Sequence, residues 1–190
     1  YVGDPALKPE RADTVSAAVS VKGSGADGWP LRIAPYYTRV HDYIDVVKLA
    51  DLTDMMGMPT GFVQLRFANH EAEFYGVDVS GSFLLWKSSA AGTAKAVAAA
   101  SWLRGRNLGD GGSLYHQMPF NAKFALEHRL GAWESAVELH VVADKNRVDA
   151  TRNEPRTNGY AFVNLRTGYA WGNYRLGLDI QNLFDKSYDL

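Results

Sequence analysis

Apolar and polar residues alternate along this chain, most regularly in its last strand-like segment. From Tyr174 to Gln181 the even positions are apolar, and the odd positions are polar or glycine. Alternation with a period of two predicts a β-strand with one apolar face. Tyr174 and Phe184 share the apolar parity, and an extended chain between them runs about 33 Å, which is long for a soluble strand. With aromatic residues at both ends, the pattern is typical of a strand that crosses a membrane.

The same alternation recurs upstream and predicts eight strands. We expect them at 13–22, 31–45, 62–86, 94–106, 120–130, 133–145, 159–171 and from Tyr174 onward. Shorter, mostly glycine-containing turns are expected at 23–28, 87–93, 131–132 and 172–173, and longer polar loops at 46–61, 107–118 and 146–158. All the long loops fall at one end, as in outer-membrane barrels, which have short periplasmic turns and long extracellular loops.

Alternation alone also allows a soluble β-sandwich or a lipocalin-like barrel, and two further features argue against these folds. Aromatic residues of the apolar parity gather beside the two shortest turns, as expected for one arc of a membrane-interface girdle: Trp133, Tyr169, Trp171 and Tyr174. The opposite parity carries charges that a dry core would not hold: Glu134, Glu138, Arg166, Arg175 and Asp179. The sequence therefore predicts an all-β, antiparallel transmembrane barrel wall with a wet interior.

Composition excludes several other classes of protein. The net charge of −1 shows no basic excess that would predict a nucleic-acid partner. The sequence contains no run of about 20 apolar residues, so no transmembrane helix is expected. The chain has no cysteine, which excludes disulfides and thiolate zinc sites. Serine, histidine and acidic residues form no nucleophile motif, so we expect neither an enzyme nor a resident cofactor.

Three segments resemble those of the TonB-dependent outer-membrane receptors. Asp4–Glu10 reads DPALKPE and is similar to the family's Asn-Pro-x-Leu-Lys-Pro-Glu segment. Asn69, followed by Tyr75–Asp78 (YGVD), resembles its Asn…Gly-x-Glu strand. Asn182–Tyr188 reads NLFDKSY and matches Asn-Leu-Phe-Asp-x-x-Tyr, which lies near the end of the barrel. The first two segments each carry an aspartate where the family more often has asparagine or glutamate.

The resemblance implies a receptor in the outer membrane of a Gram-negative bacterium. Residues 1–190 would be the C-terminal segment of its β-barrel, an arc of about eight strands from a 22-strand wall, with the plug domain and earlier strands outside this chain. Such a receptor imports a scarce nutrient (a metal ion, a metal chelate or a similar small ligand). The TonB complex energises it through the missing N-terminal part, and the wall contacts outer-membrane lipid and lipopolysaccharide. The alternatives are a passive porin or small stand-alone barrel, and an outer-membrane surface enzyme.

Methionines mark a candidate metal site in the expected long loops. Met55, Met56 and Met58 cluster in one loop, and His116 and Met118 lie in the next. Thioether and imidazole ligands suit copper, and the chain is also similar to copper- or zinc-import members of the family, so copper or zinc is a possible cargo. The alternative is that these flexible methionines only fill space.

A second hypothesis concerns the charged segment 146–158. Arg147, Arg152 and Arg156 are candidate ligands for cargo or for lipopolysaccharide phosphates, because guanidinium groups bind phosphate well. The alternative is a solvated loop whose charges pair with one another.

Overall fold

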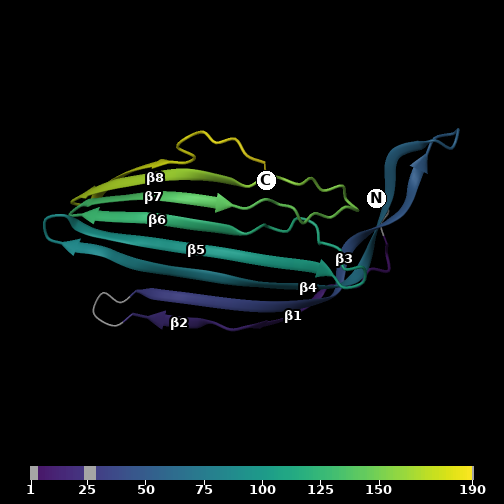
Figure 1. Ribbon diagram of the computed structural model, residues 1–190, viewed down its shortest axis with the longest axis horizontal. Coiled ribbons are helices and arrows are strands. Elements are labelled where there is room, and N and C mark those ends of the chain that lie inside the picture. Colours follow the sequence, from purple (N-terminus) through teal and green to yellow (C-terminus); the bar gives the residue numbers. More distant parts are fainter. Residues whose placement is uncertain (1–3, 24–28, 190) are drawn as a thin grey trace.

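The computed structural model describes residues 4–23 and 29–189, which form one long antiparallel sheet (Figure 1). Within these residues the sheet has nine strands in the order β1-β3-β4-β5-β6-β7-β8-β9, and β2 also pairs with β3. Their bounds are β1 Arg11–Ser16, β2 Val19–Lys22, β3 Pro30–Thr53, β4 Pro59–Ser88, β5 Gly92–Asn107, β6 Asn121–Leu130, β7 Trp133–Val142, β8 Tyr160–Trp171 and β9 Tyr174–Ile180. No helix among the described residues is long and apolar enough to cross a membrane.

From β3 onward each strand pairs with the next one along the chain, so the sheet is a simple meander. Among the described residues, β9 pairs only with β8, and β1 and β2 pair only with β3. The sheet is therefore open, with a free edge on each side. The expected all-β antiparallel wall is confirmed.

The two faces of the sheet differ sharply in polarity. Val137 and Leu139 of β7 pair with Leu126 and Phe124 of β6, and the exposed fractions of these four residues lie between 37% and 49%. We call the face that carries them the outer face. The inner face carries charged residues of β6, β7 and β8: Lys123, Glu138 and Arg166. The parity expected from alternation is therefore confirmed, with exposed apolar side chains on one face of the sheet and charged ones on the other.

The expected aromatic arc is also confirmed. The ring centroids of Trp133 and Tyr169 lie 4.9 Å apart. Trp171 continues the row, with centroids 6.0 Å from both Tyr169 and Tyr174. The four rings form one contiguous row beside the short turns at 131–132 and 172–173.

The prediction of a long loop at 46–61 is wrong. β3 continues to Thr53 and β4 begins at Pro59, so the connection is only residues 54–58. The pairing of β3 with β4 shifts register between Lys48 and Ala50 and again between Asp51 and Thr53. The first shift adds one residue to β3 and so reverses the parity of the residues that follow it, and the second adds two residues to β4. The alternation therefore disappears from the sequence although the strand continues.

The expected first strand, 13–22, is broken in two. β1 ends at Ser16 and β2 begins at Val19. Pro35 of β3 lies opposite the gap, where its carbonyl accepts a hydrogen bond from the Ala17 amide at 3.1 Å. Proline has no N–H with which to donate a hydrogen bond back to the edge strand, so the hydrogen-bond ladder is interrupted there. The turn expected at 23–28 falls largely outside the described residues.

The last strand is shorter than the aromatic spacing predicts. β9 ends at Ile180, and Asn182 and Asp185 both have a φ of 49°, which is incompatible with an extended strand. The Asn182 side chain accepts from the Lys186 amide at 2.9 Å and donates to its carbonyl at 3.0 Å. Tyr188 then stacks on Tyr160 with centroids 4.2 Å apart. The segment Asn182–Tyr188 is therefore a side-chain-capped turn, and Phe184 does not end a continuous strand.

The other two family-like segments bind each other. Oδ1 of Asn69 accepts from the Lys8 amide at 2.8 Å, and its Nδ2 donates to the Lys8 carbonyl at 3.0 Å and to the Asp42 carbonyl at 2.6 Å. Asp42 has a φ of 55° and lies at a further bulge of β3, where its register against β4 shifts between Val40 and Tyr43. A carboxylate oxygen of Glu10 accepts from the Ile44 amide. Asn69 thus ties the N-terminal segment to an irregular point of β3.

Candidate functional site

Two long connections pack against the wall at the end opposite the short turns. They are residues 108–120 and 143–159, which we call the inner loops. Leu114 is fully buried against Val40 and Ala72, a cross-strand pair on the inner face of β3 and β4. Tyr43 and Phe74 pack against the same cluster. The inner loops are therefore held against the wall rather than freely solvated.

Arg152 joins both inner loops to β3. Its Nη2 forms an ion pair with Asp45 of β3, and its Nε lies 3.5 Å from an oxygen of Asp149. Its guanidinium carbon lies 4.5 Å from the centroid of the Tyr115 ring, a cation–π geometry. Arg152 is thus engaged with partners from three segments and serves as a tie between them.

Glu154 is the second tie and the most buried charge of the inner loops. Its side chain is 2% exposed and accepts from Lys145 Nζ at 2.7 Å, with Lys145 itself only 9% exposed. It also accepts from the backbone amides of His116 at 3.1 Å and Asp149 at 2.7 Å. Burial acts to raise the pKa of Glu154, but the Lys145 ammonium and these amides outweigh it and hold the pKa below its usual value of 4.5.

This environment predicts an acid-sensitive packing of the inner loops. A carboxylate whose pKa is lowered in the folded state contributes stability above its unfolded pKa of 4.5 and loses it as the pH falls through the lower folded value. An environment-sensitive fluorophore on Arg156→Cys, in a cysteine-free receptor, should therefore report loosening below pH 4.5.

The control for this titration is Glu154→Gln, which cannot ionise. It should be looser at pH 7 and should lack the acid step. A fluorophore signal that stays constant from pH 7 to 3 in the unmodified receptor, or an equal step in both proteins, contradicts the assignment.

The three candidate arginines do not form one site. Arg147 and Arg156 are exposed, and no hydrogen bond or ion pair of their side chains occurs within the described residues. Arg152, in contrast, is held by Asp45 and Asp149. Arg152 thus fits the alternative of a loop whose charges pair with one another. Arg147 instead lines a separate pocket together with Met118.

The methionines lie at the tip of the β3–β4 hairpin, which projects beyond the rest of the sheet (Figure 1). Met55, Met56 and Met58 are all exposed. Asp54 shapes this turn, because its side-chain oxygen accepts from the amides of Met56 at 2.9 Å and Met58 at 2.8 Å. The three thioethers are therefore presented together to solvent on an ordered turn.

His116 and Met118 lie elsewhere, in the first inner loop. His116 has a φ of 59° and packs edge-on against Tyr115, with ring centroids 4.5 Å apart. In the part of the chain that the structure describes, no pocket joins them to the hairpin tip, and no three His, Cys, Asp or Glu side chains gather as a metal site. The candidate residues form two groups rather than one.

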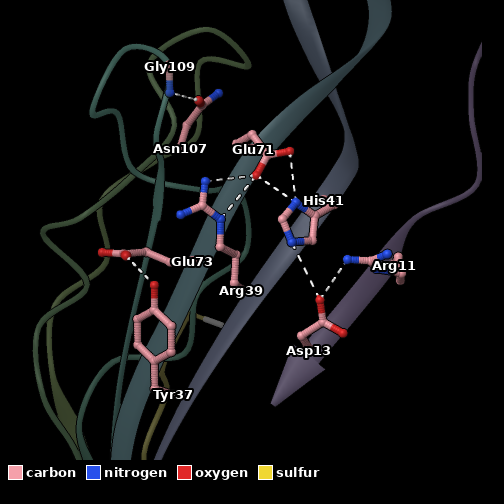
Figure 2. A network of polar contacts seen from close by, with 9 residues as sticks. All are labelled: Arg11, Asp13, Tyr37, Arg39, His41, Glu71, Glu73, Asn107 and Gly109. Atoms are coloured by element: carbon pink, nitrogen blue, oxygen red, sulfur yellow. Dashed lines mark hydrogen bonds and ion pairs between the residues drawn. The ribbon is translucent and has the colours of Figure 1, made fainter. Parts of the chain in front are cut away.

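The apolar band of the outer face ends in a charged network, shown in Figure 2. Glu71 of β4 accepts from Arg39 at 3.1 Å and lies 3.0 Å from Nδ1 of His41, both on β3. Nε2 of His41 lies 3.5 Å from Asp13 of β1, which also pairs with Arg11 at 3.0 Å. These residues tie the edge strand β1 to the sheet where the apolar band of the outer face ends.

The same network continues toward β5. Glu73 accepts from the Tyr37 hydroxyl at 2.9 Å and pairs with Arg106 (the tyrosine contact is drawn in Figure 2). Two residues after Glu73, Tyr75 of β4 meets Trp102 of β5 edge to face, with ring centroids 5.8 Å apart. This aromatic pair lies at the border of the apolar band.

Sequence reasoning missed the partners that hold the inner loops. Asp45 lies 107 positions from Arg152 along the chain, so nothing local marks the pair. Tyr115 and Glu154 likewise act through neighbours brought close only by the fold.

Comparisons with known proteins agree with this architecture. A family model described as "TonB dependent receptor-like, beta-barrel" matches residues 1–183. No curated protein sequence matches the chain. The solved structure titled copper transporter OprC has a TM-score of 0.79 and 22% identity, covering 97% of this chain and 28% of that one.

Two further structures share the fold. The pyoverdine outer membrane receptor FpvA from Pseudomonas aeruginosa PAO1, bound to pyoverdine, has a TM-score of 0.64 and 14% identity over 96% of this chain and 26% of that one. The FrpB iron transporter from Neisseria meningitidis has a TM-score of 0.65 and 13% identity over 96% of this chain and 28% of that one. This chain thus spans about a quarter of each structure. Because the family model covers nearly its whole length, the chain belongs to the TonB-dependent receptor β-barrel family.

Proposed function

We propose that the chain is the C-terminal part of a 22-strand barrel in the outer membrane of a Gram-negative bacterium, and that the complete receptor imports a scarce nutrient. The observation that carries this proposal is the division of one sheet into an exposed apolar outer face and a charged inner face, in a chain of this family. A plug domain and earlier strands complete the receptor, and the TonB complex energises it through them.

The free edges support an arc rather than a small closed barrel. The edge strands β1 and β9 present unpaired backbone groups on their open sides, and lipid does not tolerate such groups. Further strands of the receptor satisfy them. A stand-alone eight-strand barrel would instead have to pair the two edges with each other.

The packed inner loops favour gated import over a passive porin. An open pore needs a clear mouth, whereas Leu114, Arg152 and Glu154 hold both inner loops against the inner face of the wall. Such a covered mouth suits a receptor that captures a ligand before transport. The family consists of receptors and transporters, and we propose no enzymatic activity.

For the cargo we propose a metal, with copper as the first candidate. Three thioethers stand together at the hairpin tip, and soft sulfur ligands favour copper. A structure that shares the fold is titled a copper transporter, while others are titled for iron and for pyoverdine. Zinc and ferric chelates are therefore the competing cargoes, and the metal is a substrate rather than a resident cofactor.

The test is metal accumulation in a strain that lacks the receptor gene. Restoring the gene should restore copper accumulation at limiting copper. A receptor with Met55, Met56 and Met58 all changed to leucine keeps similar side-chain volume but loses the thioethers. We expect it to need at least about tenfold more copper for the same accumulation, since even indirect support of a metal site is worth that much.

Phe62→Leu is the matched control, because Phe62 is an exposed residue of the same hairpin without a metal-binding atom. It should behave like the unmodified receptor. A deletion strain that accumulates copper, zinc and iron normally would overturn the metal cargo. A triple variant with unchanged copper dependence would overturn the role of the methionines.

A further inference from the structure

The wall has a pocket where β5 extends beyond the end of its pairing with β6. Pairing between β5 and β6 ends at Ser101 and Asn121, whereas β5 continues to Asn107. Beside this unpaired stretch lies a pocket of about 300 Å³, which we call the wall pocket. Its lining includes Trp102, Arg104, Met118, Phe120, Lys145 and Arg147.

The apolar part of the wall pocket belongs to the outer face. Ala100 pairs with Ala122, which shares the parity of Phe124 on the outer face. Trp102 and Phe120 each lie two residues from this pair, so alternation keeps them on the same side. They are 40% and 43% exposed. The pocket therefore opens where the apolar band meets the charged network.

The two arginines that line the wall pocket have no ion-pair partner among the described residues. Nε of Arg104 is buried without a hydrogen-bond partner, and within the described ranges neither Arg104 nor Arg147 forms an ion pair. Lys145 is neutralised by Glu154, and the side chain of Asp144 accepts from the Gly159 amide. Other arginines of the wall, such as Arg39 and Arg106, pair with glutamates.

We infer that the wall pocket binds the phosphate group of a phosphorylated lipid of the outer leaflet. The guanidinium groups of Arg104 and Arg147 take the phosphate oxygens, a contact that the planar guanidinium makes with two parallel hydrogen bonds. Trp102 and Phe120 lie against the acyl chains. A lipid fits better than a free anion because the apolar side of the pocket is continuous with the lipid-facing band.

This inference rests on the proposed outer-membrane location, but it needs neither the cargo nor the TonB complex. It differs from the loop hypothesis in its residues, since Arg152 is engaged elsewhere and Arg156 does not line the pocket. Binding of a lipid here would anchor the rim of the wall beside the inner loops.

The test is lipid binding by the purified full-length receptor in detergent. The probe is diphosphoryl lipid A, compared with its dephosphorylated form and with inorganic phosphate as competitor. We expect the Arg104→Gln, Arg147→Gln receptor to bind lipid A at least about tenfold more weakly, the usual scale for losing charge-assisted hydrogen bonds. Arg156→Gln is the matched control and should bind as the unmodified receptor does.

The remaining measurements separate the possible outcomes. Trp102→Ala should weaken lipid A binding without changing phosphate binding. Gel mobility of the folded barrel checks that each variant is assembled, and Arg104→Lys provides a milder second variant. Equal binding of dephosphorylated lipid, full competition by phosphate at the lipid's own concentration, or an equal loss in Arg156→Gln would each overturn the proposal. Copper accumulation, measured separately, reports on the proposed import alone.

Discussion

Replacing Glu154 with alanine is expected to release both inner loops from the wall. The change leaves the Lys145 ammonium buried without its partner and leaves the amides of His116 and Asp149 without an acceptor. Removing one partner of a buried ion pair typically costs about 3–5 kcal/mol. The cost falls on the local packing of the loops, because none of these four residues belongs to a barrel strand. Hydrogen exchange of the loop amides measures it directly.

A double change separates the missing charge from the missing contact. In Lys145→Met, Glu154→Leu both charges are gone and similar apolar volume remains, so most of the loss should be recovered. Hydrogen exchange in β7 should stay unchanged in all of these proteins. Equal protection of the loop amides in Glu154→Ala and the unmodified receptor would show that the ion pair does not hold the loops.

How far the sequence predicts this fold depends on the range of the interactions. Strand positions and faces follow from local alternation, which is why Val137, Leu139 and Glu138 lie on the expected sides. The aromatic row from Trp133 to Tyr174 is equally local, since it needs only correct parity and adjacent turns.

Bulges mark the limit of that reasoning. The outer half of β3 looks like a loop because its register shifts twice after Lys48, although it pairs with β4 throughout. The opposite error occurs at the C-terminus, where Phe184 has the right parity but Asn182 turns the chain. Parity therefore predicts a strand reliably only while no bulge or left-handed residue intervenes.

The candidate site depends on contacts that alternation does not encode. The methionine cluster at the hairpin tip is local and could be located from the sequence, but its separation from His116 could not. Arg152 and Asp45 meet only through the fold. Arg104 could not be identified from the sequence either, because an arginine in a strand is common. Only the structure shows that its Nε is buried without a hydrogen-bond partner.

The family-like segments show a third case. Their resemblance to the family can be recognised from the sequence alone, but the reason for it lies in tertiary contacts. Asn69 makes three hydrogen bonds, two to the backbone of Lys8 and one to the carbonyl of Asp42 at the bulge of β3. An asparagine is suited to this position because its side chain offers both a donor and an acceptor. A motif of this kind marks a residue that connects two segments, but the sequence does not show which segments those are.

The strongest test of the membrane assignment is a charge placed on the outer face. Val137 lies in the middle of the exposed apolar band of β7, beside Leu126 and Leu165. Val137→Lys should destabilise the barrel in a bilayer by about 2–4 kcal/mol, the cost of a lysine on the lipid face near the midplane. Guanidinium titration of the complete receptor folded into phospholipid vesicles measures this cost, and outer-membrane abundance in cells should fall with it.

Ala136→Lys is the matched control, one residue away on the same strand. Ala136 lies on the inner face between Glu127 and Arg166, so a lysine there meets water and an opposite charge as well as a like one. We expect its effect to stay within about 0.5 kcal/mol, as for an ordinary exposed substitution. In a water-soluble sheet both lysines would face solvent and cost equally little. A large loss confined to Val137→Lys therefore distinguishes lipid on the outer face from water, whereas equal effects of the two variants would contradict a membrane-spanning wall.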